Sequence, residues 1–409
     1  MNTRRRSRPV LVFVLAALLA AAPAFAVTDT WDGNLPNAGA GDSLLSNALN
    51  WADNSAPVSD LVNTDLIFAG TTKLAPNVGA VFSTNSVVFN NTAGAFVFAG
   101  LTLNVGAGGI TNNDTTTQTF GNVVNFGLAT TATVNAASGA LTFSNQITAA
   151  TTLTVDGAFA TTFFSVSAGG LIIKQGTGTM SWSSPAATGT DVTVTDGTMT
   201  LSGATTFNAS SVIAVNGTSD FNINQGATLD GAQLTRATGA TLALAAGETL
   251  TVQNGGDAIL TGSFSNTTAS TIAVTGAGST FSTTSTLSMV GGSTLTVAAG
   301  GDVSSGTGSI SVGASGGNGT VSVDGSGSSF GGGNLNVGLI GSTGLLTFSN
   351  GSTGAFGSLG VNNSATAAIR YRDHGAHRTT LAGDQGMDSR RRTGSRLVQP
   401  SPKSFQSRS

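Results

Sequence analysis

Few side chains in this 409-residue chain could carry out chemistry. Between Val27 and Ile369 there are three basic residues, sixteen acidic residues, and no Cys, His or Tyr. The basic residues are Lys73, Lys174 and Arg236. Nucleophilic and acid–base catalysis usually depends on His, Cys, Lys or Tyr. We therefore expect no catalytic residue, no cofactor and no bound metal.

Paired carboxylates are the remaining route to catalysis, because two positioned carboxyl groups suffice for glycoside hydrolysis. Coiling of the chain could bring together Asp191 and Asp196, or Asp220 and Asp230. The segment Asn63-Thr64-Asp65 echoes a polygalacturonase motif, but the Asp-Asp pair, Gly-His-Gly and Arg-x-Lys of those enzymes are missing. Asp196 and Asp230 precede Gly, where a turn favours them. We interpret these aspartates as turn formers.

Calcium at stacked turns is a second chemical option. Asp196, Asp230 and Asp324 each precede Gly, and carboxylate oxygens suit this cation. No Gly-Gly-x-Gly-x-Asp array is present, so we assign no ligands. Three or more carboxylates in one cleft beside Lys174 or Arg236 would instead indicate an enzyme.

The first 26 residues have the pattern of a secretory signal peptide. Four arginines, Arg4 to Arg6 and Arg8, precede an apolar run from Val10 to Ala22, and Ala24-Phe25-Ala26 matches a cleavage site. The run is too short to span a bilayer core of about 30 Å as a helix. We expect a mature protein that begins at Val27; the alternative is a retained membrane anchor. Without Cys, no disulfide can stabilise the exported chain.

The net charge of −3 hides three unlike segments. The leader carries +4, residues 27–369 carry −13, and residues 370–409 carry +6. A body so poor in Lys and Arg cannot neutralise phosphates, so we expect no nucleic-acid partner for it.

Short phrases that alternate apolar residues with Thr, Ser or Asn fill the body. Examples are Thr152–Val155, Thr198–Leu201 and Leu295–Val297. This period of two indicates strands with one inward and one outward face. Many phrases end at Asp-Gly or Asn-Gly, which turn the chain sharply.

Strands this short cannot each support a core, but stacked coils can share one. The pattern predicts an all-β protein, most simply a right-handed parallel β-helix (a β-solenoid). With about 20 residues per coil and about 4.8 Å between coils, the rod would be on the order of 80 Å long. An array of β-sandwiches is the alternative architecture.

Internal repeats support the solenoid. The segment from Val274 to Phe281 reads V-x-G-x-G-S-x-F, and the segment from Val323 to Phe330 repeats it, with matching strands after each. The two phenylalanines are 49 positions apart, so we expect more than one coil per repeat. We assign two such repeats to residues 274–353.

These repeats resemble those shared by type V secretion passengers and PEP-CTERM proteins. Residues 169–203 resemble the autotransporter-associated β-strand repeat, but have Met180 where Leu is usual and lack the Asn/Tyr motif between the halves. The resemblance covers roughly a third of the chain. It implies an exported β-helical surface or matrix protein of a Gram-negative-type bacterium.

Both ends of the body differ from its middle. Residues 27–77 carry Trp31 and Trp51 and would form an N-terminal cap for the solenoid of residues 78–369. The alternative is that an exposed Trp stacks on sugar. Residues 370–409 are basic and weakly hydrophobic, which predicts a disordered tail.

The tail carries His374 and His377, which could hold a metal but more simply face solvent. The resemblances lead us to expect the apolar C-terminal helix of PEP-CTERM proteins or the β-barrel of autotransporters. Residues 370–409 have neither pattern, and 40 residues cannot supply the eight strands of a barrel. We suspect a reading-frame change near Ala368; a basic tail that binds anionic polysaccharide is the alternative.

From these patterns we expect a secreted structural or adhesive β-solenoid without catalytic activity, located outside the cell or on its outer surface. Its partners would be extracellular polysaccharide or cell surfaces, engaged through many weak contacts. The alternatives are a polysaccharide-binding module and a polysaccharide-degrading β-helix enzyme.

Overall fold

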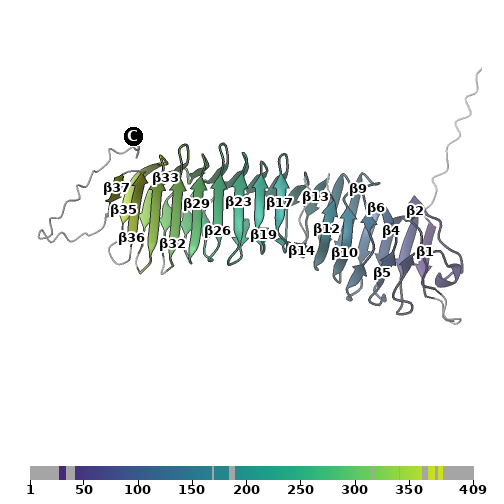
Figure 1. Ribbon diagram of the computed structural model, residues 1–409. Helices are drawn as coiled ribbons and strands as arrows, with labels where there is room; N and C mark the ends of the chain where they lie inside the picture. The colour runs from purple at the N-terminus through teal and green to yellow at the C-terminus, as the bar shows by residue number, and fades with distance from the viewer. Residues whose placement is uncertain are drawn as a thin grey trace, which may run out of the picture.

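The computed structural model describes residues 27–33, 42–167, 170–183, 189–314, 317–339, 341–361, 367–373 and 376–380. They form an elongated rod in which short strands stack from one end to the other (Figure 1). Strands of neighbouring coils pair in parallel, and the single helix among these residues is one 3₁₀ turn, Ala48–Asn50. The predicted β-solenoid is confirmed, because a sandwich array would require antiparallel pairing.

The first strand ladder follows the whole rod and gains one strand at each coil. Its members are β1 (Val27–Trp31), β2 (Asp60–Phe68), β4 (Phe82–Phe89), β6 (Leu103–Asn112), β9 (Thr131–Ala136), β11 (Thr152–Gly157), β13 (Leu171–Lys174), β15 (Asp191–Val194), β18 (Val212–Val215), β21 (Gln233–Arg236), β24 (Asp257–Leu260), β27 (Thr280–Thr283), β30 (Asp302–Ser304), β33 (Ser329–Val337) and β35 (Thr353–Val361).

The second ladder forms another wall of the rod. It passes through β3 (Asn77–Val78), β5 (Val97–Gly100), β7 (Gln118–Phe120), β10 (Leu141–Thr148), β12 (Thr161–Ser167), β14 (Thr179–Trp182), β16 (Thr198–Leu201), β19 (Asp220–Ile223) and β22 (Thr241–Leu244). The short β8 (Val124–Asn125) bridges β6 and β10. Further along, β25 (Phe264–Asn266), β28 (Leu287–Met289) and β31 (Ile310–Val312) pair in turn and end on the C-terminal halves of β33 and β35.

A third sheet is present only in the C-terminal half, so the cross-section gains a face there. It comprises β17 (Thr205–Asn208), β20 (Ala227–Asp230), β23 (Thr249–Gln253), β26 (Thr271–Thr275), β29 (Ser293–Ala298), β32 (Gly319–Asp324), β34 (Gly344–Ser349) and β36 (Ala367–Asp373), with β37 (Ala376–Thr380) antiparallel to β36. The rod bends near β13 and β14, shortly before this sheet begins (Figure 1).

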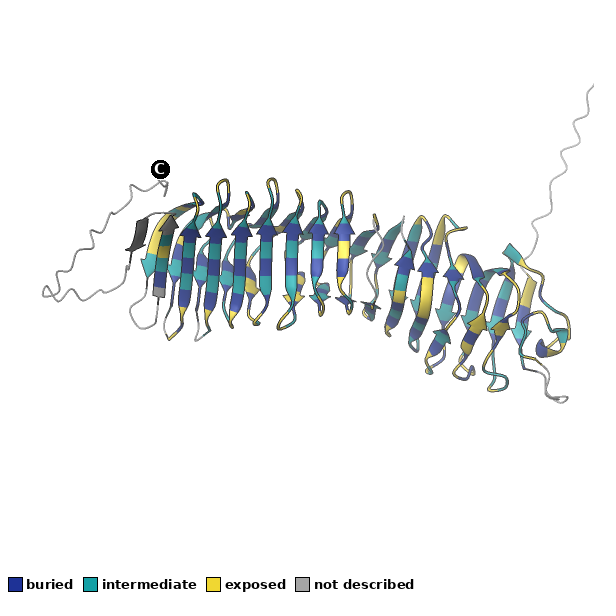
Figure 2. Ribbon diagram, viewed as in Figure 1, coloured by how far each residue is buried: buried dark blue, intermediate teal, exposed yellow. Residues whose placement is uncertain are grey.

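One continuous core runs along the rod, and its content changes with the cross-section. In the N-terminal half, Phe98, Phe120, Phe143 and Phe163 occupy matching inward positions, with ring centroids 4.7, 5.0 and 5.2 Å apart in succession. Beyond the bend the same row continues as Trp182 and then aliphatic residues, beginning with Leu201. Buried residues alternate with half-buried or exposed ones along most of the short strands (Figure 2), as the period of two predicts.

The register explains the 49-residue repeat. Phe281 pairs with Val303, and Val303 pairs with Phe330, so the two phenylalanines are two coils apart in one inward row. Both are fully buried. The prediction of more than one coil per repeat is therefore confirmed.

The repeated V-x-G-x-G-S-x-F phrase forms the corner between the third sheet and the first ladder. Gly276 and Gly325 both have φ of 90°, a conformation that favours glycine. The serine of the phrase is buried in each copy and accepts a hydrogen bond from the corner of the preceding coil: Gly255 N donates to Ser279 Oγ (3.1 Å), and Gly300 N donates to Ser328 Oγ (3.0 Å). The phrase thus links successive coils.

At the N-terminal end, Trp31 and Trp51 are buried and cover the first core residues. Their rings meet edge to face at 5.3 Å, and both pack on Phe68. Trp51 Nε1 also donates to Leu45 O at 2.8 Å. The alternative of sugar stacking on an exposed Trp is wrong, because neither ring is accessible. Regular coiling begins within residues 27–77, since β2 and β3 already belong to the ladders.

At the C-terminal end, strand structure continues past the boundary expected at residue 370. β36 extends to Asp373 and pairs with β34, and Tyr371 packs against the core. The main-chain ladder of β34 accepts this segment whatever its charge, because the pairing groups belong to the backbone. His377 lies in β37, whereas residues 1–26, His374 and residues 381–409 lie outside the described residues.

We expect Phe330→Ala to destabilise the rod by about 3–5 kcal/mol, because it removes a fully buried ring from the inward row. The C-terminal coils should open first, which limited proteolysis would detect as early cleavage near β33. Asp324→Asn is the control, since Asn suits the turn before Gly325 equally well. Equal protease resistance of Phe330→Ala and the wild type would contradict the assigned role of this ring.

Candidate functional surface

The two basic residues in the middle of the body point into the rod. Lys174 pairs in the first ladder with Val155 on one side and Val194 on the other. Arg236 pairs with Val215 and Leu260. Only 2% of Lys174 and 8% of Arg236 is exposed. Two cations therefore occupy an inward row that is otherwise mostly aliphatic.

Both cations donate hydrogen bonds to main-chain carbonyl oxygens in the turns that follow the strands of this ladder. Lys174 Nζ donates to the carbonyl oxygens of Gln175 (2.7 Å), Gly176 (2.6 Å) and Asp196 (3.3 Å). Arg236 Nη2 donates to the carbonyl oxygens of Thr261 (2.8 Å) and Ser263 (2.9 Å). Each contact set includes the turn of the next coil. The two side chains thus fasten adjacent coils at the corner.

Burial also changes the proton affinity of these groups. Burial lowers the pKa of Lys174, and the negative charges of Asp196 and Asp156 partly oppose this effect. Burial likewise lowers the pKa of Arg236. Both side chains are covered, and Lys174 Nζ and Arg236 Nη2 donate to turns, so neither group faces solvent where a substrate could reach it.

The carboxylate pairs considered above are not brought together. Asp191 begins β15 and Asp196 follows its end, so the strand separates them. Asp191 Oδ1 accepts from Val212 N at 2.8 Å, and Asp196 Oδ1 accepts from Gly197 N at 2.8 Å. Asp220 begins β19 and accepts from Thr241, whereas Asp230 ends β20 on the third sheet. Both pairs form turn and strand-end contacts instead of one acid–base site.

Two Asp-Gly turns stack on the Asn-Gly turn of the next coil. Asp230 Oδ1 accepts from Asn254 Nδ2 at 2.5 Å, and Asp324 Oδ1 accepts from Asn350 Nδ2 at 2.6 Å. Both asparagines have φ of 53°, which suits a tight turn. Within the part of the chain that the structure describes, no group of three or more His, Cys, Asp or Glu residues could hold a metal ion.

The Asn63-Thr64-Asp65 segment lies in β2, where its side chains make hydrogen bonds within the rod. Asp65 Oδ1 accepts from Asn85 Nδ2 (2.8 Å) and Ser86 Oγ (2.6 Å) of the next coil. Thr64 Oγ1 donates to Val58 O at 2.6 Å. In this segment, Asp65 therefore joins two coils and Thr64 holds the chain within one coil.

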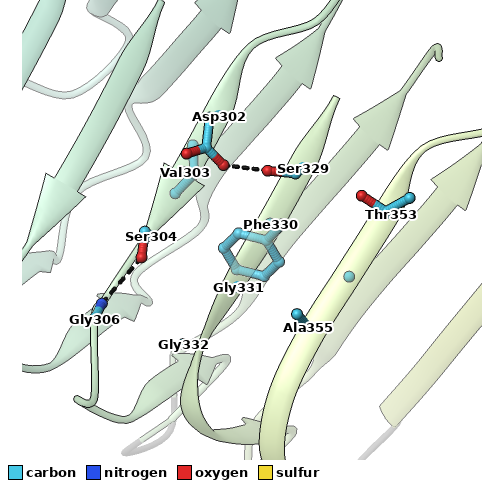
Figure 3. Close-up of a pocket in the computed structure, with 11 residues that line it drawn as sticks. Asp302, Val303, Ser304, Gly306, Ser329, Phe330, Gly331, Gly332, Thr353 and Ala355 are labelled. Carbon is cyan, nitrogen blue, oxygen red and sulfur yellow. Dashed lines mark hydrogen bonds between the residues drawn. The ribbon is translucent and has the colours of Figure 1, made fainter. Parts of the chain in front are cut away.

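A hollow of about 490 Å³ lies over β30, β33 and β35 (Figure 3). Glycine backbone at positions 331, 332 and 354 forms much of its wall, beside Phe330. The only ionisable residue among its lining residues is Asp302, which accepts a hydrogen bond from Ser329 (Figure 3). The lining therefore contains one carboxylate and a few hydroxyl groups, with no second titratable side chain.

The outer face of the third sheet presents three columns of side chains in register. One column carries Asn208, Asp230, Gln253, Thr275, Ala298, Asp324 and Ser349. The other two are rich in hydroxyl groups, and we call these two columns the threonine face. Their hydroxyl-bearing members are Thr206, Thr228, Thr249, Thr251, Thr271, Thr294, Thr296, Thr320, Ser322 and Thr347. Sequence reasoning found the Thr-x-Thr phrases without finding this face, because adjacency depends on coil length, which varies from turn to turn.

Comparisons with known proteins do not assign this chain to a family. A scan against protein-family models and searches of curated proteins and of solved structures found no match. Among the residues that the structure describes, no helix is long and apolar enough to cross a membrane.

We expect the wild type to become more stable relative to Lys174→Met as the pH rises toward 10.5, the usual value for lysine. A lysine whose pKa is lowered by folding holds fewer protons in the folded than in the unfolded chain between the two pKa values. Folding stability therefore increases with pH in that window. Urea unfolding of both proteins between pH 7 and pH 10.5 would measure it, and a difference that does not change with pH would contradict the assigned burial of the charge.

Proposed function

We propose that the protein is an exported structural or adhesive β-solenoid that acts at the cell surface or in the extracellular matrix, without catalysis. The observation that carries the proposal is a continuous rod whose polar side chains are used between coils or displayed in rows. Such a rod offers length and repeated weak contacts, which suit adhesion by avidity.

Export is supported by the leader-like residues 1–26 and by the lack of Cys. The rod needs no disulfide, because its inward rows bury aromatic and aliphatic side chains along the full length. A scaffold of this kind holds its shape outside the cell without covalent cross-links.

The absence of catalysis is supported by the fate of the candidate residues. Lys174 and Arg236 fasten turns inside the rod, and the Asp191/Asp196 and Asp220/Asp230 pairs are separated. The hollow over β30, β33 and β35 has a single carboxylate among its lining residues, Asp302, which is hydrogen-bonded to Ser329. Glycoside hydrolysis by paired carboxyl groups needs a second one.

Fractionation of producing cells tests the proposal. We expect the chain on the cell surface or in the matrix, accessible to added protease, with Val27 as its first residue by mass spectrometry. Loss of the gene should weaken attachment or matrix cohesion. Intact Arg4 to Arg8 on a cytoplasmic species would contradict export, and release of reducing ends from polysaccharide by the purified chain would contradict a non-catalytic role.

A further inference from the structure

We infer that the threonine face is the adhesive surface of the rod and that its ligand is a neutral, extended, β-1,4-linked polysaccharide lying along the rod axis. This inference rests on the proposed function and deepens it. It follows from the hydrogen-bonding state, the charge and the periodicity of the outward columns.

The hydroxyls of the two columns have no partner among the described residues. None of the ten donates to or accepts from another side chain or the main chain, although nine of them are only half-buried and one, Thr206, is exposed. On the other faces, outward hydroxyls are often engaged: Thr241 donates to Asp220, Thr280 to Asp257 and Ser329 to Asp302. The ten hydroxyls of the threonine face therefore remain available to a ligand, as do those of some outward threonines on the first ladder, such as Thr154 and Thr193.

The columns also carry no charge from β17 to β34. Aspartates begin β15, β19, β24 and β30 on the other two walls. The charged residues nearest the threonine face are Asp230 and Asp324, in the adjacent column of the same sheet, and Arg370, which pairs with Thr347 and continues one of the two columns into β36. An acidic polysaccharide or a phosphate-bearing surface would require basic residues. A neutral ligand rich in hydroxyl groups is the better match.

Periodicity selects an extended chain. Each column presents one side chain per coil, about 4.8 Å apart, which is close to the length of one sugar unit in an extended β-1,4-linked chain. Across the sheet the array is less regular, since Ala273 and Leu345 interrupt it. A flat two-dimensional lattice would need regularity in both directions, whereas a linear chain along the rod needs it in one.

Threonine supplies two kinds of contact to such a chain. Its hydroxyl both donates and accepts, and its methyl group packs against the apolar face of a sugar ring. Each contact is weak, but the sheet holds all of them in one rigid row, so they act together on a single chain. From β17 to β34 the row spans about 29 Å, and affinity should rise with oligosaccharide length up to about six sugar units and then level off.

The test compares two pairs of substitutions in the full purified chain. Thr251→Lys with Thr296→Lys places two cations on the threonine face, two coils apart in one column. Thr154→Lys with Thr193→Lys is the matched control, because these residues are also outward, half-buried, mid-strand and two coils apart, on the first ladder. Circular dichroism and thermal unfolding verify that both variants keep the fold.

Co-sedimentation with insoluble cellulose and with chitin measures binding, and soluble alginate serves as the acidic probe. We expect the wild type to bind cellulose or chitin, the Thr251/Thr296 pair to lose at least about tenfold in affinity, and the Thr154/Thr193 pair to stay within about twofold. Thr251→Val with Thr296→Val keeps the shape and removes two hydroxyls, so it should lose severalfold; full binding by this variant would overturn recognition through hydroxyls.

Other outcomes would overturn the inference in identifiable ways. Equal loss in both Lys pairs, preference for alginate, or no binding to either neutral polymer would each reject the threonine face as a site for a neutral chain. Loss on Phe164→Ser alone would move the site to the exposed ring on β12. If surface location and attachment persist while the Thr251/Thr296 pair binds normally, the adhesive role stands and only its placement fails.

Discussion

The structure depends on one constraint: no coil can satisfy its backbone or bury its apolar face alone. Each strand has between two and ten residues, too few for an independent core. Stacking solves both problems, because parallel neighbours pair every main-chain group and the inward rows merge into one core. Ends are the weak points of such a design, which explains why the bulkiest aromatic group, Trp31 with Trp51 on Phe68, covers the first coil.

The same constraint explains the contacts of several polar side chains. Ser279 and Ser328 accept hydrogen bonds from amides of the preceding corner, and Asp230 and Asp324 accept them from asparagines of the following turn. Lys174 and Arg236 join coils from inside the rod by donating to carbonyl oxygens of the next coil. In these positions, residue types that often take part in catalysis keep neighbouring turns in register.

The sequence predicts the fold better than it predicts the surface. Alternation of apolar and polar residues identifies the inward side of each strand, and the 49-residue offset of Phe281 and Phe330 identifies a two-coil unit. Alternation also places Lys174 after Ile172 on the inward side, yet one of its three carbonyl partners belongs to Asp196 of the next coil, which only the coil length brings near. The third sheet was not predictable, because its strands resemble the others and their adjacency depends on turns of unequal length. Strand pairing beyond residue 370 was missed because composition describes side chains, whereas the ladder joins main chains.

The outward side chains of the three walls differ in how many of them bond to neighbouring coils, and this difference affects what each wall can offer to a ligand. Where outward hydroxyls bond to an aspartate of the neighbouring coil, as in Thr280 with Asp257, the contact stabilises the stack and leaves little for a ligand. Threonine is frequent on the third sheet in part because it has a high strand propensity, but propensity alone would make it equally frequent on all three walls. On the third sheet, aspartate contacts between coils are confined to the column of Asp230 and Asp324, and the strand starts carry no aspartate, so the two neighbouring columns keep unbonded hydroxyls along seven strands.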